Sequence, residues 1–331
     1  MRVRHLIITA VLAGLPLFGN AASAATIEVI ETFDFPGVGK LTEPQKINNR
    51  GDIVGSVVDA ATGVTKGFYR ARNGQFSGAF TEPNDTAGLT QGRGINDART
   101  ICGNYTNVTD GTIHGFFLAR HVFTGFDLPD ASSTLTLGIN NAGDFAGSVV
   151  ASDGVTQSGF VSIGGAVTIF AVPDSTATLA YQINASNQSV GYYIDADGVT
   201  PRGYLRASDG TLTYPISPEG ATATALFGNN DSNWVVGRYT DADGITHGLF
   251  FVTPDELVSF DYPGSTFTSF NGINAQGYIT GRYVDADGGE HGILAKVNLG
   301  GNSDKTNAVP AKAIKPARSS PAGSGVGAPA M

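Results

Sequence analysis

A pattern of about 44 residues recurs six times along this chain, and it constrains the fold more than any other feature. Each copy contains an Ile-Asn pair, replaced by Asn-Asn in the fifth copy, and a glycine seven positions after the asparagine. The pairs and their glycines are Ile47-Asn48 with Gly55, Ile95-Asn96 with Gly103, Ile139-Asn140 with Gly147, Ile183-Asn184 with Gly191, Asn229-Asn230 with Gly237, and Ile273-Asn274 with Gly281. Units of this length bury their apolar faces against their neighbours, so the six copies predict one repeat architecture.

Two further positions keep the same register in every copy. A second glycine, followed by an aromatic or aliphatic residue, comes 11 or 12 positions later: Gly67, Gly115, Gly159, Gly203, Gly248 and Gly292. A threonine lies five positions before each pair: Thr42, Thr90, Thr134, Thr178, Thr224 and Thr268. Copies end in a Phe-x-x-Pro element such as Phe126–Pro129 or Phe260–Pro263. Four short antiparallel strands at this period are typical of a propeller blade.

The fold class expected is all-β, a six-bladed β-propeller of four-stranded antiparallel blades over residues 25–298. The 45 glycines favour tight turns, and no helical periodicity interrupts the repeats. The last repeat stops after its third strand, and a fourth strand with the same motif, Phe33-Asp34-Phe35-Pro36, precedes the first repeat. We therefore expect the N-terminal strand to pair with the last repeat and close the ring, which removes unpaired strand edges.

The two ends of the chain differ from the repeats. Residues 1–24 are typical of a signal peptide, with Arg2 and Arg4 before an apolar stretch and a small-residue site at Ala22-Ser23-Ala24. This pattern predicts a secreted or periplasmic protein with no membrane span in the mature chain. Residues 299–331 are rich in Ala, Pro, Gly, Ser and Lys, and we expect a disordered tail.

Charge separates the repeats from the ends. The formal net charge is −9, but the leader carries two arginines and the tail three net positive charges, so the repeats carry −14. Nucleic acid is not an expected partner, because phosphate binding needs a basic surface. The loops between second and third strands should make one face acidic, and the opposite face should receive much of the basic complement. That complement comprises Lys46, Arg50, Arg70, Arg72, Arg99, Arg120 and Arg206.

The repeats resemble those of the extracellular HAF-type repeat proteins of bacteria. The resemblance covers about residues 27–298 and rests on G-I-N-N-x-G, D-A-D-G-x-x-H-G-F and F-D-x-P-G. His114-Gly115-Phe116 departs from the His-Ala-Phe of that family. The resemblance implies a repeat fold and an extracellular location, and it brings no activity to this chain.

Few residues are candidates for chemistry, and no catalytic constellation, metal site or cofactor site is predicted. His114, His247 and His291 occupy one repeat position, but equivalent positions of a ring lie too far apart to share a metal ion at about 2.1 Å. We interpret them as polar residues leaving a hairpin. Cys102 is expected to be a buried, inert thiol, and Trp234 either stacks a sugar or has no special role.

The acidic loops are the predicted binding residues. Three of them carry paired carboxylates in a D-A-D-G sequence: Asp195 and Asp197, Asp241 and Asp243, Asp285 and Asp287. Such loops are able to bind Ca²⁺ weakly, although the full twelve-residue calcium loop is absent and Asp and Gly are also good turn formers.

We expect an exported, monomeric binding or scaffolding protein that presents its acidic loop face to a protein, glycan or cation partner. The alternatives are an enzyme of the lyase or glycosidase kind, using paired carboxylates, and a passive extracellular structural protein.

Overall fold

The computed structural model describes residues 25–37, 41–254, 256–299 and 318–320. Within these ranges the chain forms strands and turns and no helix, so the predicted all-β class is confirmed. No helix of the described residues is long and apolar enough to cross a membrane. The predicted signal peptide and most of the predicted tail lie outside the described residues.

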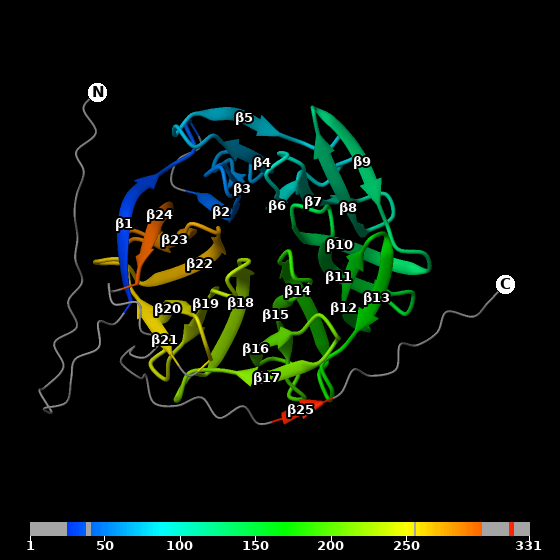
Figure 1. The fold of residues 1–331 in the computed structure, drawn as a ribbon. Helices are drawn as coiled ribbons and strands as arrows, with labels where there is room; N and C mark the ends of the chain where they lie inside the picture. Colours follow the sequence, from blue (N-terminus) through cyan, green and yellow to red (C-terminus); the bar gives the residue numbers. More distant parts are fainter. Residues whose placement is uncertain (1–24, 38–40, 255, 300–317, 321–331) are drawn as a thin grey trace, which may run out of the picture.

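Successive strands form four-stranded antiparallel units, which we call blades 1 to 6, arranged in a ring (Figure 1). Blade 1 contains β2 (Thr42–Ile47), β3 (Ile53–Val58), β4 (Thr65–Arg70) and β5 (Phe76–Phe80). Blade 2 contains β6 (Gln91–Ile95), β7 (Ile101–Asn107), β8 (Thr112–Ala119) and β9 (Val122–Phe126). Blade 3 contains β10 (Ala131–Ile139), β11 (Phe145–Ala151), β12 (Gln157–Ile163) and β13 (Ala166–Phe170).

Blade 4 contains β14 (Ala177–Ile183), β15 (Ser189–Ile194), β16 (Pro201–Arg206) and β17 (Leu212–Ile216). Blade 5 contains β18 (Ala223–Asn229), β19 (Val235–Thr240), β20 (Thr246–Phe251) and β21 (Leu257–Phe260). Blade 6 combines β22 (Phe267–Ile273), β23 (Tyr278–Val284) and β24 (Glu290–Asn298) with β1 (Thr26–Phe33) from the start of the chain. The first strand of each blade is innermost, and we call the four positions a to d.

The N-terminal strand pairs with the last repeat, as the sequence predicted. Strand β1 runs antiparallel to β24, from Thr26 opposite Asn298 to Phe33 opposite Gly292. The blades are not fully separate sheets, because single parallel bridges join strand c of one blade to the start of strand a of the next. Gln157 with Ala177 and Thr246 with Phe267 are two of these bridges, and they merge blades into sheets of nine and eight strands.

The recurring asparagine forms a ring of hydrogen bonds that links each blade to the next. In each a–b turn the Asn side-chain oxygen accepts a backbone N–H inside its own turn, as Asn140 does from Ala142 and Asp144, at 2.9 Å each. Its Nδ2 donates to the backbone carbonyl of the equivalent asparagine in the next blade, at 2.9–3.3 Å: Asn48, Asn96, Asn140, Asn184, Asn230 and Asn274. The last bond runs from Asn274 back to Asn48. One polar residue per repeat therefore links all six blades.

The other repeat positions are also structural. The invariant threonines are at most 1% exposed, and several accept the backbone N–H of the preceding d–a connection, as Thr134 does from Leu128 at 3.0 Å. A side chain on Gly147 would overlap the carbonyl oxygen of Leu135, so strand b approaches strand a too closely for any other residue. The aromatic residue after the second glycine, such as Phe160 or Tyr204, is fully buried between strands.

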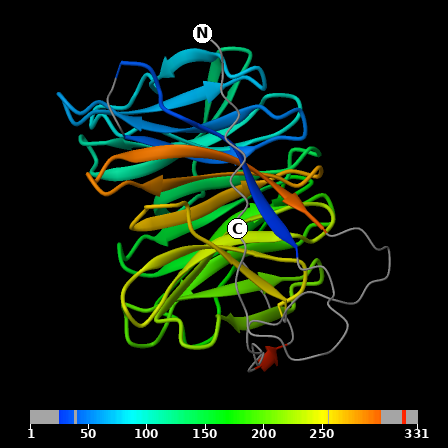
Figure 2. The same ribbon diagram turned by 90° about the vertical axis from the view of Figure 1, so that its left-hand side faces the viewer.

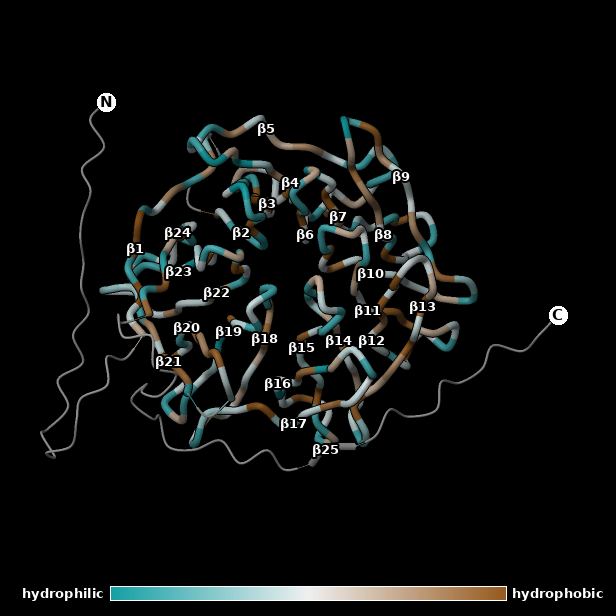
Figure 3. The backbone as a smooth tube through the Cα atoms, in the orientation of Figure 1, coloured by the Kyte–Doolittle hydropathy of each residue, from teal (hydrophilic) through white to brown (hydrophobic). Residues whose placement is uncertain are grey.

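The strands run between two faces of the ring, seen edge-on in Figure 2. The a–b and c–d turns form one face, called the a–b face, and the b–c loops with the d–a connections form the other, called the b–c face. Figure 3 shows hydrophobic segments within the blades and hydrophilic segments in many of the loops. Beyond the blades, β25 (Arg318–Ser320) pairs antiparallel with β17, so three residues of the predicted tail lie against blade 4.

Candidate functional site

The predicted acidic loops lie on the b–c face, and their paired carboxylates have different surroundings. The first aspartate of each pair is partly buried and holds its own turn: Asp241 Oδ1 accepts the N–H groups of Asp243 and Ile245, both at 2.9 Å. Asp285 accepts Asp287 N–H and Gly289 N–H in the same way. These carboxylates therefore stabilise their own turns by accepting backbone N–H groups.

The second aspartates are exposed. Asp197 accepts the backbone N–H groups of Val199 and Thr200 and the hydroxyl of Thr200, which lower its pKa. In the described part of the chain, the carboxylates of Asp243 and Asp287 have no hydrogen-bond partner and face solvent. Asp195 accepts only the N–H of Ala196. Among the described residues no group of three or more His, Cys, Asp or Glu side chains is placed to hold a metal ion. Binding by the six predicted aspartates remains a prediction.

The three equivalent histidines each lie between two carboxylates of their own blade. His247 contacts Asp261 Oδ1 through Nδ1 at 2.8 Å and Asp241 Oδ2 through Nε2 at 3.1 Å. Its ring stacks on Tyr239 with 4.8 Å between centroids. His114 and His291 repeat this arrangement with the b–c loop aspartate, the aspartate of the Phe-Asp motif and a stacked tyrosine.

Sequence variation among the blades supports a structural role for these histidines. Where strand c begins with Lys66, Ser158 or Arg202 instead, the Phe-Asp motif is also replaced, by Thr81, Ala171 and Ser217. Histidine and aspartate thus occur together in blades 2, 5 and 6. Burial lowers the pKa of His114, but its bonds to Asp127 and Asp110 outweigh burial and raise the pKa above its usual value.

A pocket of about 220 Å³ opens on the b–c face where blades 4, 5 and 6 meet. It is lined by Tyr192 and Ile194 of β15, by Val199 and Pro201 beside the first D-A-D-G loop, by Ala223, Thr224 and Ala225 of β18, by Arg238 and Thr240 of β19, and by Thr246 and Phe267. The b–c loops that carry Asp195, Asp197, Asp241 and Asp243 flank it. This volume is well above the roughly 10–15 Å³ of the same measure that a single water molecule needs, so the pocket is large enough for a small ligand.

Arg238 is the charged residue of this pocket. Its guanidinium contacts the rings of Phe227 and Phe267, with its central carbon 5.2 and 5.3 Å from their centroids. Arg282 also contacts the Phe267 ring, at 5.2 Å from its centroid, but donates to Glu290 at 2.6 Å and lies 3.2 Å from Glu43. Within the described residues Arg238 has no ion pair and donates no hydrogen bond. The guanidinium thus contacts two rings, and its N–H groups have no acceptor among the described residues.

Burial and the neighbouring Arg282 both lower the pKa of the Arg238 guanidinium. The opposite side of the pocket is aromatic: Tyr192 stacks on Tyr181 at 5.5 Å, and burial together with Tyr181 raises the pKa of the Tyr192 hydroxyl, which stays neutral. Thr240 and Thr246 join their hydroxyls at 3.0 Å along one wall. The pocket thus combines an unpaired cation, aromatic surface and hydroxyl groups.

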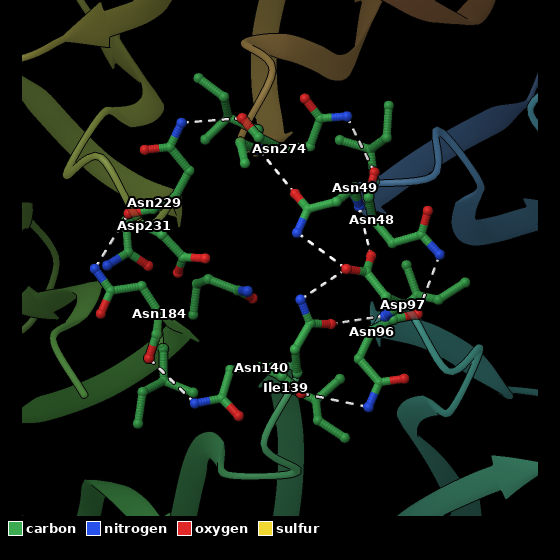
Figure 4. A pocket seen from close by; sticks show the side chains of 18 residues that line it. Asn48, Asn49, Asn96, Asp97, Ile139, Asn140, Asn184, Asn229, Asp231 and Asn274 are labelled. Carbon is green, nitrogen blue, oxygen red and sulfur yellow. Dashed lines mark hydrogen bonds between the residues drawn. The ribbon is translucent and has the colours of Figure 1, made fainter. Parts of the chain in front are cut away.

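A second, smaller cavity of about 50 Å³ lies on the ring axis at the a–b face (Figure 4). The asparagine ring surrounds it, and Asp97 and Asp231 lie at its edge. Asp97 accepts the backbone N–H of Asn49 at 2.7 Å and a side-chain N–H of Asn141 at 2.8 Å, so it links neighbouring blades. This cavity holds very few water molecules.

The predicted basic face is wrong for three of its residues. Lys46 is 4% exposed and points toward the axis, where its Nζ lies 5.9 Å from the ring centroid of Tyr181. Arg70 is buried against Phe33 and pairs with Glu31, and Arg206 is buried over Phe170. Their methylene stems and planar guanidinium groups pack on the interior, which a count of charge per turn does not reveal.

Two other predicted features have structural roles. Cys102 is fully buried, and burial raises the pKa of its thiol to about 12, so it is not a nucleophile. Trp234 packs edge-on against Phe250 at 5.9 Å and over Gly277, where a Cβ would come within 2.8 Å of its ring. It belongs to the packing of blades 5 and 6.

Comparison with known proteins gives a likeness of fold in outline. No family model matches the chain, and no match was found among curated protein sequences. Among solved structures, a variant of Aleuria aurantia lectin in complex with Fucα1-6GlcNAc is 12% identical, covers 78% of this chain and 96% of its own, and has a TM-score of 0.48. A second structure of that lectin, described as a six-bladed β-propeller, is 10% identical with a TM-score of 0.44. The BP39L lectin from Burkholderia pseudomallei is 13% identical over 76% of this chain and 82% of its own, with a TM-score of 0.36. At these values no site residue is transferred from the lectins.

Sequence reasoning missed the pocket and its arginine. Arg238 follows the first repeated glycine, in the position held by Ser56, Asn104, Ser148, Tyr192 and Arg282 in the other blades. Most of these residues are polar or aromatic in strands otherwise built from small and β-branched residues. Variation at one inward-facing repeat position was the available signal.

Proposed function

We propose that this protein is an exported carbohydrate-binding protein whose site is the pocket between blades 4, 5 and 6. The observation that carries the proposal is the composition of that pocket. Sugar rings present C–H surfaces to aromatic side chains and hydroxyl groups to polar ones, and the pocket offers Tyr192, Phe267, the paired hydroxyls of Thr240 and Thr246, and Arg238. Its volume suits one sugar residue with the rest of a chain outside.

The surroundings favour binding over hydrolysis. A glycosidase that retains configuration needs two carboxyl groups about 5 Å apart, and one that inverts it needs them about 6.5–9.5 Å apart. No carboxylate is among the described residues that line the pocket. Of the flanking aspartates, the exposed carboxylate of Asp243 is placed to contact hydroxyl groups of a longer glycan at the rim, so the predicted acidic loops form the outer part of the same proposed surface.

Filling the pocket tests this proposal. Ala223→Phe places a ring in the cavity, and Ala177→Phe places the same ring at the equivalent position of blade 4, outside the pocket. A panel of neutral and acidic mono- and oligosaccharides would be screened by saturation-transfer NMR and measured by calorimetry. We expect wild type and Ala177→Phe to bind and Ala223→Phe to lose binding. Sugar binding that Ala223→Phe leaves unchanged would place the site elsewhere, and a panel without any ligand would reject the proposal.

A finer test removes one hydroxyl. Thr240→Val keeps the shape of the side chain but removes the partner of Thr246, and Thr106→Val makes the same change at the equivalent position of blade 2. We expect only Thr240→Val to weaken binding. A separate experiment measures the melting temperature with and without calcium. A rise with calcium would support a role for the D-A-D-G loops in binding a cation, because a ligand that binds only the folded state stabilises it.

A further inference from the structure

Arg238 has the geometry of an anion receptor. Its guanidinium contacts two phenyl rings, with the central carbon 5.2 Å from the ring centroid of Phe227 and 5.3 Å from that of Phe267, and these contacts restrict its movement. A fixed guanidinium loses little conformational entropy when its N–H edge is bonded. That edge has no acceptor among the described residues, although it lines a pocket large enough for a small ligand.

Arg282, the neighbour of Arg238, has carboxylate partners that Arg238 lacks among the described residues. Arg282 occupies the equivalent position in blade 6 and stacks on the same Phe267 ring, but two carboxylates, Glu43 and Glu290, neutralise it. No carboxylate lines the pocket of Arg238 in the described chain; Glu43 attracts its charge without forming an ion pair, and Arg282 opposes it. A half-buried cation that no carboxylate contacts directly is costly, and a ligand that brings a negative charge to it reduces that cost.

The acidic loops around the pocket do not cancel this preference. Their second aspartates are exposed, and charges on the surface are screened beyond about 8 Å at physiological ionic strength. Asp195 and Asp241 are directed at backbone N–H groups of their own turns. Among the described residues that line the pocket, where solvent is partly excluded, Arg238 is the charged one.

We infer that the ligand of this pocket is an acidic sugar residue, whose carboxylate is bound by the N–H edge of Arg238 while its ring lies among Tyr192, Phe267 and the threonines. Guanidinium and carboxylate match in a planar, two-bond geometry, which sets a uronic acid apart from its neutral parent sugar. This inference rests on the proposed carbohydrate-binding function and specifies its ligand class.

The experiment compares methyl β-glucuronide with methyl β-glucoside, which differ in the carboxylate, by calorimetry and competition NMR on the full chain. We expect wild type to bind the glucuronide about ten-fold or more tighter, the effect of a charge-assisted bond pair. Arg238→Gln should reduce that ratio to less than about two-fold while weak binding of the glucoside persists. Arg202→Gln is the matched control: it removes a positive charge from the same face, but Arg202 lies outside the pocket and donates to the carbonyl of Ala221.

The possible outcomes distinguish failure of the acidic-sugar inference from failure of the proposed carbohydrate-binding function. Equal affinity of wild type for both glycosides would overturn the acidic-sugar inference and leave carbohydrate binding intact. Loss of both ligands to the same degree in Arg238→Gln would give the arginine a general structural role and also overturn it. A preference for glucuronide that Arg202→Gln abolishes equally would show a nonspecific charge effect. Binding of neither glycoside, nor of any other sugar, would refute the proposed function itself.

Discussion

Replacing Lys46 by methionine should stabilise this protein, and the gain should depend on pH in a defined way. Lys46 is 4% exposed, and its Nζ has no hydrogen-bond partner in the described structure. Burial, with a smaller contribution from Arg93, lowers the pKa of its ammonium group from 10.5 to about 7, against a small opposing effect of Cys102. Methionine keeps the length and apolar stem of the side chain and removes the unsatisfied amine.

The magnitude follows from the pKa shift. Between pH 7 and 10.5 the unfolded chain binds a proton at Lys46 that the folded chain does not, so stability rises with pH in this window. Below pH 7 both states are protonated and the full penalty applies, about 5 kcal/mol at 1.36 kcal/mol per pKa unit. At pH 9 about 2 kcal/mol of the penalty remains. These are upper values, because local relaxation reduces the cost of a buried charge.

Urea unfolding of wild type and Lys46→Met at pH 6 and pH 9 checks the prediction. The stability advantage of the variant should shrink by roughly 3 kcal/mol between the two values, given the same pKa shift. Lys66→Met, a change at a half-exposed lysine of the same blade, should stay within about 0.5 kcal/mol at both. An advantage of Lys46→Met that is equal at pH 6 and pH 9, or a destabilised variant, would refute the reasoning.

Three other predictions concern the repeat positions. His114→Gln should destabilise the protein more at pH 5.5 than at pH 8.5. The protonated histidine, whose pKa is raised in the folded protein, stabilises the fold fully below pH 6.5, and this stabilisation is lost as the pH rises through the pKa of the folded state. Urea midpoints of wild type and variant at the two pH values measure the difference, and equal losses of stability at both would contradict the prediction. Asn184→Ala should cost about 3 kcal/mol, since it removes one link of the asparagine ring, takes the donor from the buried carbonyl of Asn230, and takes the acceptor from the N–H groups of Ser186 and Gln188. The change Asn73→Ala, at an exposed residue, should cost little. Deleting residues 25–37 should lower the melting temperature by more than about 10 °C, because it exposes the edge of β24 and the core around Phe33; a truncated chain that melts with the wild type would show that the β1 pairing contributes nothing.

The sequence determined the architecture because each repeat position carries a backbone requirement. The asparagine of each a–b turn, the glycine that lets strand b approach strand a, and the threonine that accepts a d–a N–H recur because six copies of one geometry need them. The displaced Phe33–Pro36 motif likewise predicted that β1 pairs with β24. The residues that meet these local hydrogen-bonding and steric requirements recur at the same positions of each repeat. Comparing the six repeats within the one chain therefore reveals them.

The proposed binding pocket depends on tertiary structure, because it forms where different blades meet. Arg238, Phe227 and Phe267 come from three strands in two blades, and nothing in their sequence spacing shows that the rings contact the guanidinium or that no carboxylate reaches it. The D-A-D-G loops are the more conspicuous sequence feature, yet four of their six carboxylates accept backbone N–H groups of their own turns: Asp195, Asp197, Asp241 and Asp285. Likewise, Lys46 looked like a surface charge until the closed ring placed it beside Tyr181 of the opposite blade. Whether a charge is paired depends on distances between repeats, and only the packed ring sets those distances.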